Sequence, residues 1–368
     1  MTIIVGAGAA GLLAAVAAVR RGKQVLIYEK MGHPGIKLGV AGGGRCNLSN
    51  SGDLLAGLHC CNFLRPALAR LDNAALRKIL AEMGVATCVD QWGRVYPQDM
   101  NGQELAAFLY SWLAKKGARF CFHSPLTNII TRNGKLDALE ISGKAVPCTR
   151  AVLACGGKAW PQTGSDGAAL ALLEHAGHEI IPLLPGLAPL KTGEIWPREM
   201  KGISLKNVII SITAKGRTLD STRGDLLFTH FGLSGPAVLD VSHAAAKARR
   251  QGQPTQIVID LLPDMEREEI RAVLMRQAEK TAGNALSALL PAQLAKKLGG
   301  EKYIKGLAPS TLDQLAAGLK EVRLEIVDVL GGHAMVSQGG VQLRQVNPQT
   351  MESVVLGSSA LVGSSHNR

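Results

Sequence analysis

The chain has 368 residues, 46% of them hydrophobic and 19% charged, which is typical of a globular protein of about two domains. This composition excludes a disordered chain, and the 42 glycines follow no three-residue period, which excludes collagen. The net charge of +12 is spread along the sequence, so it indicates diffuse solvated charge and disfavours a nucleic-acid partner. An aromatic content of 4% also argues against base-stacking platforms for single-stranded nucleic acid.

The first 21 residues predict a soluble strand, turn and helix. Residues 2–19 carry no charge and are followed by Arg20 and Arg21, whereas a secretory signal places its positive charge before the apolar run. We expect a strand over 2–5 and a helix over 9–21. No segment reaches the ~18 apolar residues of a membrane-spanning helix, so no membrane partner is expected.

The turn between this strand and helix is rich in glycine and reads Gly6-Ala7-Gly8-Ala9-Ala10-Gly11. Gly6 permits a tight turn, Gly8 lets a pyrophosphate approach bare backbone, and Gly11 allows the helix to pack on the strand. The helix N-terminus would offer N–H groups to phosphate, and Glu29, after a second strand, would accept a hydrogen bond from a ribose hydroxyl. The pattern predicts a dinucleotide site without distinguishing FAD from NAD.

A second glycine cluster follows in a loop that reads Lys37-Leu38-Gly39-Val40-Ala41-Gly42-Gly43-Gly44-Arg45-Cys46-Asn47. Consecutive glycines cost chain entropy, so we expect their amides to wrap an anion or a flat ring, with Lys37 and Arg45 adding charge. A flexible loop without a ligand is the alternative. Cys46 is interpreted as a small packing residue and not as a reactive thiol.

Cysteines and histidines offer no defensible catalytic group. The seven cysteines are odd in number and contain no Cys-x-x-Cys, which disfavours a disulfide framework and a zinc ribbon and fits the cytoplasm. They are Cys46, Cys60, Cys61, Cys88, Cys121, Cys148 and Cys155. His175 and His178 could share a metal ion, but we expect two surface or capping histidines. His230 either reaches a substrate or makes a structural hydrogen bond.

The remaining pattern predicts two domains. Helices are expected over 73–83 and from Asn101 onward, with hairpin turns at Asn133-Gly134 and Ser142-Gly143. A buried strand over 151–157 ends in two glycines and leads through a polar loop into a helix, a second nucleotide-binding edge. After Pro182 short strands and then helices follow, and strands return beyond 322. We predict an α/β domain formed by 1–187 and 323–368, interrupted by a β-plus-helix insert over 188–322.

Several motifs together resemble a family of bacterial NAD(P)/FAD-dependent oxidoreductases. The family includes aminoacetone-oxidase-type FAD-binding proteins and a branch assigned to bile-acid reduction in gut bacteria. The resemblance spans 1–353 and implies a Rossmann-like FAD-binding domain with an inserted β-barrel and helical domain that covers the flavin. The motifs are the Gly6–Gly11 turn with Glu29 and the segments 42–50, 154–165, 227–236 and 339–353.

The resemblance also implies a set of cofactor-binding residues. The Gly6–Gly11 turn and Glu29 would hold the ADP part of FAD, and Leu126 would touch the adenine side through its backbone. Lys37 and the triple-glycine loop would lie near the pyrophosphate and the flavin. The full set is Gly6, Gly8, Ala9, Ala10, Gly11, Glu29, Lys30, Lys37, Gly43, Gly44, Arg45, Cys46, Asn47, Leu126, Ala154, Gly156 and Gly157.

The sequence departs from the family pattern after Ser353. The family continues with a strand, a Phe-Ala-Gly-Glu segment and a Gly-Gly-Tyr-Asn turn that opens a long helix. Residues 354–368 are instead apolar and rich in serine. We expect a frameshift or truncation that leaves the C-terminal part of the FAD-binding domain incomplete and weakens flavin retention.

In function, the resemblance implies a cytoplasmic FAD-dependent oxidoreductase with a small-molecule substrate and NAD(P)H as the electron donor. A flavin- or nucleotide-binding protein without turnover is one alternative. An RNA-associated flavoenzyme, prompted by the net charge, is another. No metal site is predicted, and the sequence does not determine the substrate, the catalytic acid or the oligomeric state.

Overall fold

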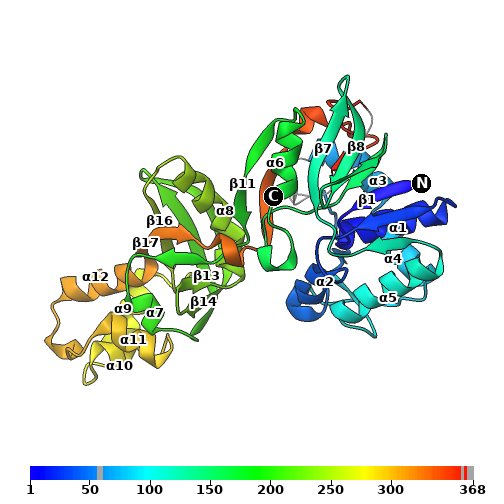
Figure 1. Cartoon of the computed structure of the whole chain (residues 1–368). Helices are drawn as coiled ribbons and strands as arrows, with labels where there is room; N and C mark the ends of the chain where they lie inside the picture. The colour runs from blue at the N-terminus through cyan, green and yellow to red at the C-terminus, as the bar shows by residue number, and fades with distance from the viewer. Residues whose placement is uncertain (56–60, 358–359, 363–368) are drawn as a thin grey trace. The chain divides into compact units, whose positions relative to one another are not determined.

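The computed structural model describes residues 1–55, 61–357 and 360–362, so Cys60 and most of the serine-rich tail lie outside the described residues. The chain divides into two compact units (Figure 1). The first is formed by Met1–Leu183 and Val336–Arg368, and the second by Leu184–Met335. The predicted fold class is confirmed, since the first unit carries a parallel sheet of the Rossmann type and the second a closed barrel with helices.

The first unit is built on a five-stranded parallel sheet. In spatial order its strands are β19 (Ala360–Val362), β10 (Ala151–Leu153), β1 (Thr2–Val5), β2 (Val25–Tyr28) and β6 (Arg119–Cys121). The side chains of Ile4 and Ile27 are fully buried, as expected for central strands of a parallel sheet that is covered on both faces. Because the strands are parallel, the segments that follow β1, β2 and β10 begin at the same edge of the sheet.

Six α-helices belong to the described part of this unit. α1 (Ala9–Arg20) and α5 (Gly102–Lys115) share one apolar core with β1 and β2. α5 begins as predicted, since Asn101 and Glu104 form a capping box at its N-terminus. The others are α2 (Ile36–Val40), α3 (Cys61–Arg70), α4 (Asn73–Glu82) and α6 (Ala168–His175).

Three small antiparallel sheets complete the described part of the first unit. The predicted turns at Asn133-Gly134 and Ser142-Gly143 are confirmed, and all four residues have positive φ (53°, 71°, 50° and 76°), as a type I′ turn requires. These turns join the strands of one sheet. The three sheets are β3 (Ser49–Asn50), β5 (Arg94–Pro97) and β4 (Thr87–Val89); β7 (Leu126–Arg132), β8 (Lys135–Ile141) and β9 (Lys144–Pro147); and β11 (Ile180–Gly186) with β18 (Val336–Val341).

The second unit is a closed six-stranded barrel with helices. Around the barrel the strands are β12 (Leu190–Thr192), β15 (Gly232–Ser234), β14 (Arg217–Thr229), β13 (Ser204–Ala214), β16 (Thr255–Asp260) and β17 (Val322–Val329). Alternate residues of β13 are buried, which is the pattern of a strand with one face on a core. The helices are α7 (Trp196–Glu199), α8 (Pro236–Arg250), α9 (Arg267–Met275), α10 (Ala282–Leu286), α11 (Ala292–Gly299) and α12 (Pro309–Lys320). No helix in the described ranges is both long and apolar enough to cross a membrane.

The end of the second unit differs from the sequence-based boundary. Strand β17 pairs with β12 and β16 inside the barrel, whereas the sequence places a return to the first unit from residue 323. Leu324 and Ile326 are buried in the barrel core, and the unit continues to Met335. An alternating apolar pattern predicts a strand with one buried face, but it does not say which sheet the strand joins.

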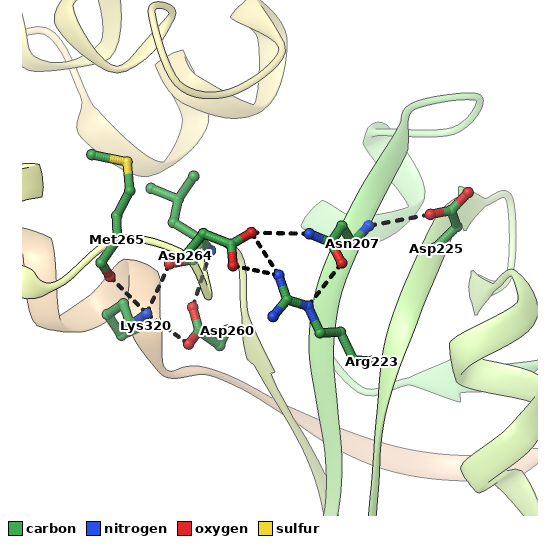
Figure 2. A network of polar contacts seen from close by, with 8 residues as sticks. Asn207, Arg223, Asp225, Asp260, Asp264, Met265 and Lys320 are labelled. Carbon is green, nitrogen blue, oxygen red and sulfur yellow. Dashed lines mark hydrogen bonds and ion pairs between the residues drawn. The ribbon is translucent and has the colours of Figure 1, made fainter.

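A polar network braces the barrel against the segment that follows β16 (Figure 2). Arg223 Nη2 on β14 lies 2.5 Å from the Asp264 carboxylate, and its Nε donates to Asn207 Oδ1 at 2.7 Å. Asn207 Nδ2 in turn donates to Asp264 Oδ2 at 3.0 Å. On the other side of the same segment, Lys320 at the end of α12 pairs with Asp260 at 2.8 Å. These contacts join three strands to the helical part of the unit.

Candidate functional site

Packing requires glycine at two positions of the β1–α1 turn, but not at a third. A Cβ atom on Gly6, whose φ is +98°, would lie 2.4 Å from the Ala154 carbonyl oxygen. A Cβ atom on Gly11 would lie 1.8 Å from the Gly6 carbonyl oxygen. Both positions therefore need glycine for the fold itself. A Cβ atom on Gly8 would meet no atom within 4 Å, so the space beside Gly8 is open.

The N-terminus of α1 begins in this open space. Gly8 is the N-cap, no side chain in the described ranges caps the helix, and its first turn holds no acidic residue. Ala9 and Ala10, which begin the helix, are exposed. The first N–H groups of α1 are therefore available to an anion, and the helix dipole favours one.

Glu29 joins the end of β2 to the glycine turn. Its Oε2 accepts a hydrogen bond from the Ala7 N–H at 2.6 Å, and its Oε1 accepts one from the Met31 N–H at 2.8 Å. Each carboxylate oxygen retains a second lone pair that a hydroxyl donor can use. The neighbouring Lys30 forms an ion pair with Asp166 at 2.8 Å, so the ends of two strand–loop segments meet here.

Lys37 reaches from α2 to the loop that precedes α6. Its Nζ donates to the Ala159 carbonyl oxygen and to Ser165 Oγ, both at 2.8 Å. Burial lowers the pKa of Lys37, because the ammonium loses water contacts. Among the residues that the structure describes, no carboxylate forms an ion pair with it. Gly156 belongs to the same cluster, since a Cβ atom there would lie 2.6 Å from Ser165 Oγ.

The triple-glycine loop has a backbone that other residues rarely adopt. Gly42, Gly43 and Gly44 have φ values of +58°, +68° and +90°. A Cβ atom on Gly43 would meet no atom within 4 Å, so this backbone is open in the same way as that of Gly8. The Arg45 guanidinium that follows lies 4.0 Å from the centroid of the Tyr96 ring. The predicted combination of bare backbone and positive charge is therefore present in the loop.

Cys46 and Asn47 end this loop in different environments. The Cys46 side chain is fully buried in the core of the first unit, and burial raises its pKa to about 11. A neutral, enclosed thiol is a poor nucleophile, which agrees with its interpretation as a packing residue. Asn47 is exposed.

The segment after β10 meets the first glycine turn. The Ala154 N–H donates to the Val5 carbonyl oxygen at 2.7 Å, and Gly156 adopts a φ of +76°. Gly157 follows directly and leads toward the loop that holds Ser165. Leu126 lies elsewhere, at the start of β7, where it packs against the core that contains Val5. The structure thus brings the first glycine turn and the segment after β10 into contact, and Lys37, on the helix before the triple-glycine loop, reaches the loop that follows. Leu126 is not part of these contacts.

A pocket of about 700 Å³ opens beside the triple-glycine loop. This volume lies within the range of small-molecule sites. Its lining combines glycines of the loop, one residue from each of β4 and β5, and residues that precede and begin α5. The lining residues are Gly39, Gly43, Gly44, Arg45, Cys88, Pro97, Gln98, Asp99, Met100, Asn101 and Gln103.

The sequence does not predict the contacts that four residues make in this site, although Ala159 and Ser165 lie within the 154–165 motif. The polar, glycine-rich loop over 160–167 is the signal that points toward Ser165 and Asp166. Nothing in the local sequence marks Ala159 or Tyr96, because their contacts with Lys37 and Arg45 depend on long-range packing.

The chain is similar to known proteins over most of its length. Residues 1–363 match the family model described as HI0933-like protein Rossmann domain. The chain is 28% identical over 365 residues to the 3-dehydro-bile acid delta(4,6)-reductase of Clostridium scindens, covering 95% of this chain and 88% of that protein. It is 30% identical over 367 residues, with the same coverage, to the ribosomal RNA dihydrouridine synthase of Escherichia coli.

Among solved structures, the chain is similar to the 3-ketosteroid delta1-dehydrogenase of Sterolibacterium denitrificans. The two share 14% identity with a TM-score of 0.49, and the alignment covers 98% of this chain and 92% of the other.

Proposed function

The chain belongs to the HI0933-like family of FAD-dependent Rossmann proteins, and on that premise we propose that it is a reductase of carbon–carbon double bonds conjugated to a carbonyl group. The relatives' names support this reaction type. One names the reduction of unsaturated bile acids, and the other names the formation of dihydrouridine. Dihydrouridine differs from uridine by two hydrogens across a double bond next to a carbonyl. When bound, FAD supplies the hydride chemistry that both reactions need.

One observation carries the proposal: packing closes Gly6 and Gly11 but leaves Gly8 open at an uncapped helix N-terminus. A fold that only needed a tight turn would have no use for bare backbone at Gly8. The pyrophosphate of a dinucleotide fits this position, because the first N–H groups of α1 and the helix dipole favour an anion. We assign to Glu29 a hydrogen bond from the adenosine ribose; the hydrogen bond from the Ala7 N–H, which fixes the carboxylate beside the turn, supports this role.

We propose that Lys37 binds the anionic part of FAD and that Arg45 lies beside its electron-rich flavin. The Lys37 ammonium uses two of its three hydrogens within the protein and has one left for a ligand. Arg45 and the open Gly43 backbone would face the flavin end. The rest of the proposed FAD-binding set is Gly6, Ala9, Ala10, Gly11, Lys30, Gly44, Cys46, Asn47, Leu126, Ala154, Gly156 and Gly157.

For the substrate, we favour a uridine in ribosomal RNA, with NADH or NADPH as the electron donor. The net charge of +12 suits a polyanionic substrate, and two relatives named ribosomal RNA dihydrouridine synthase, from Escherichia coli and Haemophilus influenzae, are each 30% identical over 95% of the chain. This choice revises two expectations from the sequence: the small-molecule substrate that the resemblance implies, and the diffuse charge as an argument against a nucleic-acid partner. An unsaturated steroid-like acid is the second candidate, because of the similarity to the Clostridium scindens reductase.

The test is anaerobic reduction followed by product analysis. The purified chain is saturated with FAD, its flavin spectrum is recorded, and NADH and NADPH are added separately. The reduced protein is then offered unmodified ribosomal RNA or an unsaturated bile acid, and products are identified by mass spectrometry. We expect bleaching by one nucleotide and formation of dihydrouridine. A Gly8→Asp variant, which places a carboxylate at the pyrophosphate position, provides the control without cofactor.

Two results would contradict the proposal in different ways. Bound FAD that neither nucleotide reduces would indicate a flavin-binding protein without turnover. Reduction of the bile acid alone would keep the reaction type and overturn the choice of RNA.

A further inference from the structure

The first unit exposes a tryptophan on a rigid turn. Trp92 lies between β4 and β5 with 62% of its surface exposed. Asp90 Oδ1 accepts hydrogen bonds from the N–H groups of both Trp92 and Arg94 at 2.9 Å, which fixes the turn. The Ser51 N–H donates to the carbonyl oxygen of Gly93 at 2.7 Å and ties the turn to β3. A single exposed apolar side chain is ordinary, so the neighbours of Trp92 decide its meaning.

Two arginines stack on aromatic rings along this same small sheet. The Arg94 guanidinium lies 4.8 Å from the centroid of the Trp92 ring, and the Arg45 guanidinium lies 4.0 Å from that of Tyr96. Arg94 and Tyr96 are two positions apart on β5, so they point to the same face of the strand. Arg94 Nε also lies 3.9 Å from Asp90 Oδ2, a separation that makes the ion pair weak. The face therefore carries two cations next to an open aromatic ring.

One of these two arginines, Arg45, also lines the pocket beside the triple-glycine loop. Arg45 is both the cation on Tyr96 and a wall of that pocket of about 700 Å³. The other lining residues include Gln98, Gln103 and the acidic Asp99. A carboxylate disfavours a phosphate inside the pocket, but it can accept an N–H of a neutral base. The phosphates would then remain outside, near the arginines.

We propose that the β3–β5–β4 sheet guides a single-stranded RNA segment, with one base stacked on Trp92, and delivers an extruded uracil into this pocket. The inference rests on the proposed function with RNA as the substrate. A base inside a helix cannot reach an enzyme's reacting group, so it must leave the stack and enter a pocket. Stacking on an aromatic ring combined with arginine–phosphate contacts is how proteins hold single strands. The low aromatic content of the chain does not oppose this, since the proposal needs one exposed ring.

The test measures RNA binding by Trp92 and Arg94 variants of the FAD-loaded protein. A short, fluorescently labelled single-stranded RNA that contains uridine is titrated at several salt concentrations and followed by fluorescence anisotropy. We expect Trp92→Ala to weaken binding about fivefold or more, and Trp92→Phe, which keeps a ring, to restore most of it. Arg94→Ala should weaken binding and reduce the slope of log affinity against log salt by about one.

Matched variants control for general effects of surface changes. Tyr303→Ala removes another exposed aromatic ring, 55% exposed in the second unit, and Arg132→Ala removes an exposed arginine from β7. Both should bind RNA as the unchanged protein does. All variants are first compared for FAD content and thermal unfolding, so that a folding defect is not read as lost binding.

The outcomes separate this inference from the proposed function. If the unchanged protein binds and reduces RNA but Trp92→Ala and Arg94→Ala do so equally well, the sheet is not the guiding surface and the proposed function stands. If the unchanged protein reduces its flavin with NAD(P)H but binds no RNA, both the RNA substrate and this surface are overturned. If all four alanine variants lose affinity alike, the binding is diffuse and the assignment to this sheet is wrong.

Discussion

The Lys37 ammonium lies 2.8 Å from the Ser165 hydroxyl, a contact between residues 128 positions apart in sequence. It joins α2, which leads into the triple-glycine loop, to the loop that follows β10. Gly156 and the Lys30–Asp166 ion pair lie in the same region. A half-buried ammonium with a lowered pKa and no carboxylate partner in the described ranges is unfavourable by itself. An anionic ligand would relieve this cost, which is why Lys37 is central to the proposed cofactor site.

Replacing Lys37 by methionine should therefore weaken FAD binding more than it changes stability. The variant keeps the length of the side chain but loses a charge-assisted hydrogen bond, worth about 1.5–3 kcal/mol, so the Kd for FAD should rise about 10-fold or more. Removal of the partly desolvated charge should leave the apoprotein's thermal unfolding nearly unchanged. FAD titration followed by fluorescence quenching measures the first effect.

The control for this variant is Lys23→Met, which removes an equal charge from an exposed position after α1. An equal loss of FAD affinity in both variants would show that net charge acts at a distance and would remove Lys37 from the site.

The turn glycines offer a pair of substitutions with opposite effects. In Gly11→Ala the new methyl group would lie 1.8 Å from a backbone oxygen, so the free energy of unfolding should fall by about 3 kcal/mol or more. In Gly8→Ala the methyl group meets no protein atom, so the apoprotein should unfold as before, while FAD affinity falls because the pyrophosphate can no longer approach the backbone. Thermal unfolding without FAD and titration with FAD measure the two effects. Equal FAD affinity of Gly8→Ala and the unchanged protein would argue against a pyrophosphate at Gly8.

The local features of the fold could be predicted from sequence because each depends on neighbouring residues. The glycine turn, the Asn101 cap and the Asn133-Gly134 hairpin all express backbone preferences over a few positions. Features that depend on distant partners could not. The alternation in β17 predicts a strand but not its place in the barrel. The Lys37–Ser165 and Arg45–Tyr96 contacts have no local signature, although one member of each pair lies in a predicted loop.

His178 illustrates the same limit for burial. The sequence suggests two surface or capping histidines, yet α6 ends at His175 and the His178 side chain is 3% exposed. Its side-chain partner, Ser353, lies 175 positions away in the sequence, so no local pattern indicates the contact. The prediction for His178 is wrong, whereas His175 is exposed as expected.

The cysteines predict a simple labelling pattern. Burial raises the pKa of Cys46 to about 11 and that of Cys155 to about 12, so almost none of either thiol is ionised near neutral pH. We expect both to resist alkylation by iodoacetamide in the native protein and to react fully in urea. Peptide mapping by mass spectrometry measures each site. Rapid native labelling of Cys46 would show an accessible thiolate and would reopen a chemical role for it.

We expect His178 to make the free energy of unfolding depend on pH. Ser353 Oγ accepts the N–H groups of Val355 and Leu356 at 3.1 and 2.9 Å, so its own hydrogen must go to His178 Nε2, 2.8 Å away. This arrangement requires an unprotonated Nε2. The hydrogen then resides on Nδ1, which is buried and, within the described ranges, has no hydrogen-bond partner. Burial is the largest influence on the pKa of His178 and lowers it.

Because folding lowers the pKa of His178, the protein should lose stability as the pH falls. The unfolded histidine titrates near pH 6.5, so above this value both states are neutral and the contribution to stability is complete. As the pH falls below about 6.5, the unfolded chain takes up a proton that the folded chain resists, and stability is lost at up to about 1.4 kcal/mol per pH unit. His178→Leu should remove this part of the acid sensitivity, whereas His175→Leu, at the exposed end of α6, should retain it. Urea unfolding of the three proteins between about pH 7.5 and 5.5 provides the measurement, because carboxylates contribute equally to all of them. An identical pH dependence in His178→Leu and the unchanged protein would show that His178 protonates as readily in the folded chain as in the unfolded one.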